Sequence, residues 1–167
     1  MQLLIIRHAI AEDREEFAKT GESDDERPLT SFGRQRMVRN TRGLRRVART
    51  IDLLATSPLK RAVQTAHVIG EVYGIKEIAV CEAMRPERPM KDFARWLGRH
   101  RDYDVVAVVG HDPHVSTLAT WLISGLAEPR VQFKKGGCMA LDIPDQIEGG
   151  ATLLWSIAPA QLRRLGD

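Results

Sequence analysis

The chain has 167 residues, of which 43% are hydrophobic and 28% charged, and its net charge is +3. This composition excludes disordered and fibrous classes, and the length predicts a single domain over residues 1–167. No apolar run reaches the length of a membrane span and no secretory signal is evident, so we expect a cytoplasmic protein. Cys81 and Cys138 form no CxxC pair, and we expect buried free thiols rather than a disulfide or zinc site.

The first expected element is a buried strand over Leu3–Ile6, a short apolar run that ends abruptly in Arg7 and His8. Ligands of α/β sheets bind just beyond the carboxyl ends of the strands, which is where these two side chains would emerge. A guanidinium beside an imidazole suits an anion such as phosphate. Taken alone, the pair is equally compatible with the start of a solvated loop, so the rest of the chain must decide.

The segment from Ala9 to Pro28 is acidic and lacks a sustained apolar stripe, which predicts a long loop with a helical turn near Arg14–Lys19. A loop of this length in a compact domain is usually functional. Thr30 or Ser31 is placed to cap the helix that follows.

That helix is expected over Ser31–Arg49, and Gly33 and Gly43 should weaken it by up to ~1 kcal/mol each relative to Ala. Its narrow apolar stripe consists of Met37, Thr41, Leu44, Ala48 and Ile51. Arginines are concentrated between Arg34 and Arg49. We interpret them as a solvated helix face; the alternative is a surface for nucleic acid or an acidic protein.

A second strand is expected over Asp52–Thr56, followed by Ser57 and a proline, a pattern typical of a capped helix start. The helix should end at Gly74. Its apolar face consists of Leu59, Ala62, Val63, Ala66, Ile69 and Tyr73. Arg61 falls in the first turn, close to the carboxyl end of the preceding strand, and we interpret it as a second phosphate-binding arginine rather than a surface cation.

The remaining elements complete an α/β pattern. The clearest strand is the continuous apolar run Asp104–Val109, which must be buried on both faces and ends in Gly110 and His111. We also expect a strand over Glu77–Val80, an irregular stretch over Cys81–Pro89, helices over Met90–His100 and Pro113–Ile123, and an antiparallel hairpin of Gly136–Ile143 and Leu153–Ala158. The predicted fold is one three-layer α/β/α domain with a mostly parallel central sheet and an antiparallel edge hairpin.

Two buried strands therefore end in histidine, His8 and His111. As parallel neighbours, these strands would bring the two imidazoles together over one pocket, with Arg7 and Arg61 beside them. Chance placement of all four residues at equivalent strand ends is improbable, and this favours an anion site over a solvated loop.

Three segments together resemble the signature segments of the histidine phosphatase superfamily: Arg7-His8, residues 57–66 (SPLKRAVQTA) and residues 110–113 (GHDP). The short chain and the RPLT segment at 27–30 resemble its small bacterial branch, the SixA phosphohistidine phosphatases. The similarity covers Met1 to Ile123, and the tail fits a closing hairpin. It implies a phosphoglycerate mutase-like fold.

The resemblance also implies roles for individual residues. His8 would be the nucleophile that accepts the phosphoryl group, and Arg7, Arg61 and His111 would hold the phosphoryl oxygens. Arg27 resembles a further phosphate-binding arginine of the small branch. Ser57, as a helix cap, would only support Arg61. The resemblance implies no metal and no cofactor, because the arginines supply the positive charge that phosphoryl transfer needs.

Three positions depart from the family pattern. Ala9 replaces the usual glycine after the nucleophile, which is a minor change where the backbone is ordinary. His114 stands where a small residue is common; we interpret it as a helix-surface histidine, and the alternative is a substrate contact. The clear proton-donor glutamate of larger members is missing, and we favour Glu82 over the acids at 12 and 13, although solvent could protonate a phosphohistidine leaving group.

The chain has no room for an inserted cap around a small substrate, which favours a phosphohistidine presented on a protein, such as a histidine phosphotransfer domain. The first alternative is a phosphatase of small phosphate esters. Further alternatives are a non-catalytic basic module that binds nucleic acid or protein, and a metal site of His8, His111 and Asp112, which the adjacent arginines disfavour. We expect no membrane partner.

Overall fold

The computed structural model describes residues 1–166, and its centre is a six-stranded sheet with the order β3-β2-β4-β1-β5-β6. The strands are β1 (Gln2–Arg7), β2 (Leu53–Thr56), β3 (Ala79–Val80), β4 (Val105–Gly110), β5 (Cys138–Asp142) and β6 (Thr152–Ile157). The first four are parallel, and β5 and β6 pair antiparallel at one edge. The predicted mostly parallel sheet with an antiparallel edge hairpin is confirmed.

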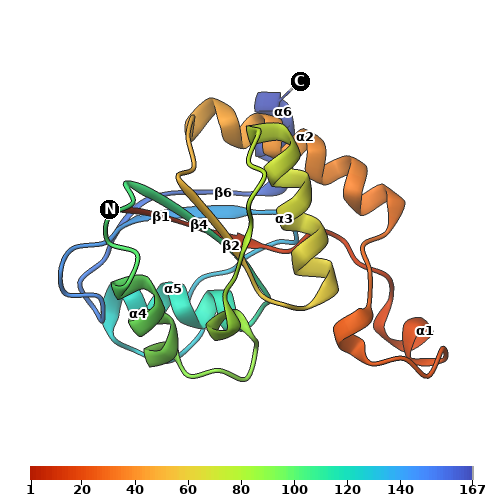
Figure 1. Cartoon of the computed structure of the whole chain (residues 1–167), viewed down its shortest axis with the longest axis horizontal. Helices are drawn as coiled ribbons and strands as arrows, with labels where there is room; N and C mark the ends of the chain where they lie inside the picture. Colours follow the sequence, from red (N-terminus) through yellow and green to blue (C-terminus); the bar gives the residue numbers. More distant parts are fainter. Residues whose placement is uncertain (167) are drawn as a thin grey trace.

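Helices cover both faces of this sheet, as Figure 1 shows. One face carries α2 (Ser31–Val47), α3 (Lys60–Tyr73) and α6 (Pro159–Gly166), and the other carries α4 (Met90–Gly98) and α5 (His114–Ser124). The short helix α1 (Arg14–Ala18) projects away from these layers, and the 3-10 turns η1 (Asp24–Glu26) and η2 (Glu82–Met84) lie in loops. None of the helices in residues 1–166 is long and apolar enough to cross a bilayer.

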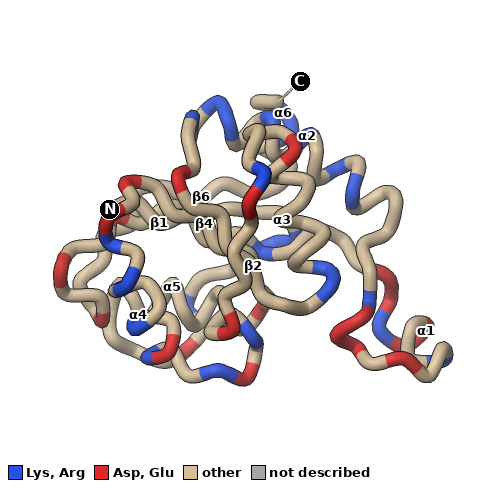
Figure 2. The backbone as a smooth tube through the Cα atoms, viewed as in Figure 1, with Lys and Arg blue, Asp and Glu red and all other residues tan. Residues whose placement is uncertain are grey.

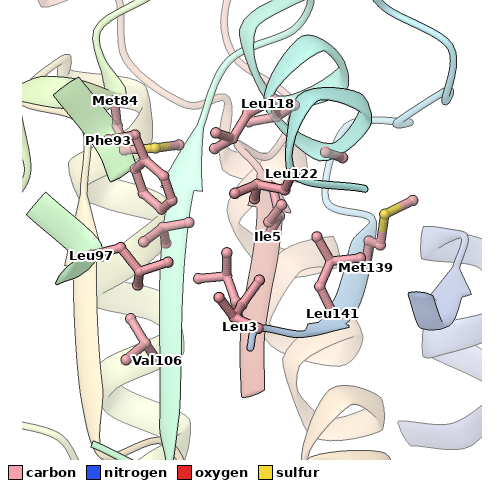
Figure 3. Packing of buried hydrophobic residues seen from close by; sticks show 14 of the residues in the cluster. Leu3, Ile5, Met84, Phe93, Leu97, Val106, Leu118, Leu122, Met139 and Leu141 are labelled. Atoms are coloured by element: carbon pink, nitrogen blue, oxygen red, sulfur yellow. The ribbon is translucent and has the colours of Figure 1, made fainter. Parts of the chain in front are cut away.

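The central strand β1 is apolar throughout because both of its faces are covered. Leu3 and Ile5 pack toward α4 and α5, where they meet residues such as Phe93 and Leu118 (Figure 3). Leu4 and Ile6 pack on the opposite face with residues of α2 and α3. Each such buried side chain contributes about 1.5–3 kcal/mol. Cys81 and Cys138 are buried free thiols within these two layers, as expected.

The pairing register of β1, β2 and β4 places the carboxyl ends of these three parallel strands next to one another. In the β1–β4 pair Arg7 lies opposite Gly110, and in the β2–β4 pair Thr56 lies opposite Val109. The backbone N–H of His8 donates to the Gly110 carbonyl over 2.9 Å, and that of Ser57 donates to the Val109 carbonyl over 2.9 Å. The residues that follow β1, β2 and β4 are therefore neighbours.

The helix α6 was not predicted from the sequence. It packs along α2 and explains Gly43 of that helix, whereas Gly33 is approached by the segment that follows β1. A Cβ on Gly43 would lie 1.8 Å from the carbonyl oxygen of Leu162, and one on Gly33 would lie 2.0 Å from that of Ile10. The glycines are points of close backbone approach, so the cost that they impose on the isolated helix is offset by packing.

Lys and Arg positions recur along α2 (Figure 2), and part of this arginine cluster contacts α3. Arg34 forms an ion pair with Glu71 over 2.9 Å, and Arg45 donates to the Val72 carbonyl over 2.9 Å. Both arginines remain exposed, as a solvated helix face requires.

Candidate active site

The two histidines that follow the parallel strands lie together. The ring centroids of His8 and His111 are 5.2 Å apart, and the rings are tilted by 49°. Both are buried, with 6% of His8 and 3% of His111 exposed. The predicted meeting of the two imidazoles at the carboxyl edge of the sheet is confirmed.

The backbone holds the His8 ring in one tautomer. Its Nδ1 lies 2.7 Å from the carbonyl oxygen of Ala9, which can only accept a hydrogen bond, so the proton is on Nδ1 and the lone pair is on Nε2. Ala9 does not adopt a positive φ, and its N–H donates to the Thr65 hydroxyl over 3.0 Å. The alanine at this position therefore causes no backbone strain.

The pKa of His8 is lowered to about 3, and burial is the largest cause, acting against the hydrogen bond to Ala9. The positive charges of Arg61, Arg7 and Lys135 lower it further. The imidazole is therefore neutral at pH 7, and its Nε2 is a competent nucleophile.

His111 is held from the other side by Ser57. Its Nε2 lies 2.8 Å from the Ser57 hydroxyl, and its buried Nδ1 has no hydrogen-bond partner within residues 1–166. Burial is the largest cause that lowers the pKa of His111, to about 2, followed by the charge that His8 acquires when it is protonated in acid and by the charge of Arg61. The expected capping role of Ser57 is wrong: α3 begins only at Lys60, and no side chain caps it.

Two arginines border the histidines, and each has a buried N–H group with no hydrogen-bond partner among the described residues. Arg61 is 4% exposed, and its Nη1 donates to the Asp24 carbonyl over 2.8 Å. The Nη1 of Arg7 donates to the Phe133 carbonyl over 2.6 Å and lies 3.8 Å from Asp112. The Nε atoms of both are buried, and neither has a hydrogen-bond partner in the described part of the chain. Such orphaned N–H groups suit a bound oxyanion.

Asp24 joins Arg27 to this group. Its carboxylate lies 2.8 Å from the Nε of Arg27 and 3.3 Å from the Nη2 of Arg61. Burial raises the pKa of Asp24, but hydrogen bonds from Arg27 and Arg14 outweigh it and lower the pKa to about 2. The acidic loop thus holds Arg27, which is nearly buried, beside Arg61.

The structure does not place His114 and Glu82 against the two facing histidines. His114 is buried, and its Nε2 lies 3.2 Å from the Arg88 carbonyl, so its interpretation as a surface histidine is wrong. Glu82 is exposed and forms an ion pair with Arg85 over 2.9 Å. Its role as a proton donor stays a prediction.

Sequence reasoning missed the segment before β5. The Phe133 carbonyl accepts from Arg7, and the charge of Lys135 acts on His8. The only sequence signal is a pair of lysines before two glycines, which has no periodicity to reveal its position. No group of three or more His, Cys, Asp or Glu side chains in residues 1–166 is arranged to hold a metal ion.

Comparisons with known proteins agree with this geometry. Residues 3–93 match the model of the histidine phosphatase superfamily (branch 1). An uncharacterized protein from Picosynechococcus sp. is 31% identical over 144 residues, covering 84% of each chain.

The fold is shared with solved phosphatases at lower identity. The protein histidine phosphatase SixA in complex with tungstate superposes with a TM-score of 0.81 at 24% identity, covering 97% of this chain and 99% of that one. The SixA from Agrobacterium tumefaciens, to which phosphohistidine phosphatase activity is assigned, superposes with a TM-score of 0.76 at 22% identity, covering 95% of this chain and 97% of that one. The alpha-ribazole phosphatase from Shigella flexneri gives 0.72 at 20% identity, covering 95% and 97%. The family model spans more than half of this chain, and we conclude that the chain belongs to the histidine phosphatase superfamily, branch 1, and is a phosphatase, as the three motifs predicted.

Proposed function

We propose that this phosphatase works through a covalent phosphohistidine on His8 and acts on phosphohistidine in a protein. The observation that carries the mechanism is the His8 ring. Its Nδ1 is fixed to the Ala9 carbonyl at 2.7 Å, its pKa is far below 7, and two arginines with unused donors lie beside it.

In the first step, the lone pair of His8 Nε2 attacks the phosphorus, and the bond from phosphorus to the leaving atom breaks. Arg7, Arg61 and Arg27 neutralise the phosphoryl oxygens, and the Nδ1 of His111 donates to one of them. These groups supply alignment and positive charge, which is most of what phosphoryl transfer requires. In the second step, water attacks the phosphorus, inorganic phosphate leaves, and the lone pair returns to Nε2 of neutral His8.

The leaving group also needs a proton, and we propose that Glu82 supplies it when the substrate is an ester. Its side chain is exposed and shares the Arg85 guanidinium with Asp25, at 2.9 and 3.0 Å respectively. An imidazole leaving group is basic and takes a proton from solvent, so a phosphohistidine substrate depends less on this acid.

Two observations support a protein substrate. The longest connections at this edge of the sheet are residues 8–30, which carry α1, followed by residues 125–137 and 81–89, so the described part of the chain forms no large inserted cap over the site. The superposed SixA structure is that of a protein histidine phosphatase. The similarity to an alpha-ribazole phosphatase favours a small phosphate ester as the second candidate. The ratio of kcat/KM for a phosphorylated histidine phosphotransfer domain to that for a panel of phosphate esters decides between them.

The mechanism is tested by trapping the intermediate. After rapid quenching with alkali, the wild-type protein should carry acid-labile phosphate that maps to His8, and His8→Ala should carry none and turn over no substrate. His67→Ala is the matched control, because His67 is exposed on α3 outside this cluster. Unchanged turnover in His8→Ala would exclude the proposal.

A further inference from the structure

A second pocket, of about 320 Å³, adjoins the site at the carboxyl end of β1. It lies between the first half of α2, the segment before β5 and the start of α6. Its charged and polar lining includes Arg7, Arg36, Asn40, Lys134, Lys135 and Arg163. Arg7 belongs to both sites, so a ligand in this pocket lies next to a group bound at His8.

The segment that carries the two lysines is fixed to β1. The N–H of Gly136 donates to the carbonyls of Arg7 and His8 over 3.0 and 3.2 Å, and the Gly136 carbonyl accepts from Asn40 over 3.2 Å. Asn40 is only 3% exposed, and its Oδ1 accepts from Arg163 over 3.0 Å. Gly136 has a φ of +79°, and a Cβ there would lie 2.6 Å from Asn40 Nδ2. This backbone clamp places Lys134 and Lys135 at the pocket.

Three of the cations at the pocket have no carboxylate partner among the residues that the structure describes. Among the residues that the structure describes, no Asp or Glu lines it, and Arg36, Lys134 and Lys135 have no carboxylate within ion-pair distance. The Arg36 guanidinium lies over the ring of Phe32 on the same helix, with its central carbon 4.3 Å from the ring centroid. Clustered cations in a concave site attract an anion that presents several oxygens.

We propose that this pocket binds a second anionic group of the substrate, a phosphate or a carboxylate, while the reacting phosphoryl group occupies the His8 site. The inference rests on the proposed function and narrows its substrate class. Two kinds of molecule present this chemistry: a small bisphosphate, and a phosphohistidine segment with acidic side chains beside the modified residue.

The test compares matched substrates in two arms. The first arm pairs ethanediol, propanediol and butanediol bisphosphates with the corresponding alkyl monophosphates. The second arm pairs phosphohistidine peptides that carry flanking glutamates with peptides that carry glutamines. We expect kcat/KM to favour the more anionic member by about tenfold or more in at least one arm, the effect typical of a charged hydrogen bond. The arm that shows the preference identifies the source of the anion.

Variants then locate the effect. Arg36→Gln combined with Lys134→Gln should abolish the preference and leave kcat/KM within about twofold for the substrates that lack the second anionic group, because neither side chain contacts the reacting group. Arg46→Gln combined with Arg49→Gln removes the same charge from exposed positions at the far end of α2 and just beyond it, and should keep the preference. Equal kcat/KM within every pair, or a preference that survives in the first double variant, overturns the proposal.

Binding separates this proposal from the catalytic one. In calorimetric titrations of His8→Ala, at least one bisphosphate should bind about tenfold more tightly than its monophosphate, whether or not the wild type hydrolyses either. Tight bisphosphate binding by a protein whose wild type turns over no substrate of either arm would contradict the proposed function and support the pocket. Turnover together with equal binding within every bisphosphate–monophosphate pair and no preference in the peptide arm would support the proposed function and contradict the pocket.

Discussion

The hydroxyl of Ser57 lies 2.8 Å from His111 Nε2, and the same oxygen accepts the N–H of Leu59 over 3.4 Å. The oxygen accepts one hydrogen bond from Leu59, and we infer that the hydroxyl donates its own proton to Nε2. The proton of the neutral His111 ring is then on Nδ1, which is buried without a partner in the described residues. Ser57 is thus a positioning residue that directs an N–H donor of His111 toward the phosphoryl group.

Replacing Ser57 by alanine should lower kcat by about 10- to 100-fold, as expected for the loss of one hydrogen bond that fixes a tautomer. The informative measurement is the ¹⁵N NMR spectrum of His111. Ser57→Ala should shift the ring toward the Nε2–H tautomer, and Ser57→Thr, which keeps the hydroxyl, should restore the Nδ1–H form. A tautomer that is unchanged in Ser57→Ala would contradict this role.

Stability should fall in acid because His8 and His111 are buried in the neutral form. Their folded pKa values, about 3 and about 2, lie below the ordinary value of 6.5, so below pH 6.5 the unfolded chain binds more protons than the folded one. The stabilisation is complete above pH 6.5 and is lost progressively as the pH falls toward 3. At pH 5 each histidine should lower the free energy of unfolding by about 2 kcal/mol relative to its value at pH 8.

Urea unfolding at pH 8 and pH 5 measures this effect. His8→Asn should remove about half of the pH dependence that the two histidines cause. His67→Asn, at an exposed position of α3, should retain all of it. The same pH dependence in wild type and His8→Asn would show that His8 is not buried in the neutral form.

Glu82→Gln should affect two substrate classes differently. An alkyl ester leaves as an alkoxide and needs an acid, so its kcat should fall by about 10²-fold or more, whereas phosphohistidine hydrolysis should change by less than about threefold. Arg85 keeps its pair with Asp25 in this variant, so the loop should stay in place.

Glu87→Gln is the control for Glu82, since Glu87 is exposed in the same loop. It should leave both rates unchanged. Equal losses on both substrates in Glu82→Gln would contradict its assignment as the acid and indicate a role in substrate binding.

The two central strands and the histidines after them were predictable because their signals are local. The apolar runs of β1 and β4 are continuous, and parallel pairing aligns whatever follows them. The position of Lys135 was not predictable, because it depends on the antiparallel pairing of β5 with β1. The burial of His114 depends on the loop that carries Arg88, which the sequence shows only as irregular.

The helix α6 illustrates the same limit. It is short, and only Leu162 is buried in it, so its sequence shows too little periodicity to predict a helix. Its close contact with Gly43 appears only when the chain is folded. The consequence for stability is opposite to what helix propensity alone predicts.

Gly43→Ala should therefore destabilise the protein although alanine favours an isolated helix by about 1 kcal/mol. The added Cβ would meet the Leu162 carbonyl oxygen at 1.8 Å, and α6 must move to avoid it, at a net cost of about 1–3 kcal/mol. Gly98→Ala is the matched control, because its Cβ would meet no atom within 4 Å at the end of α4. It should be neutral or raise stability by about 0.4–1 kcal/mol. Urea unfolding of both variants at pH 8 decides the matter: a Gly43→Ala variant as stable as Gly98→Ala would mean that α6 does not pack against α2 in solution.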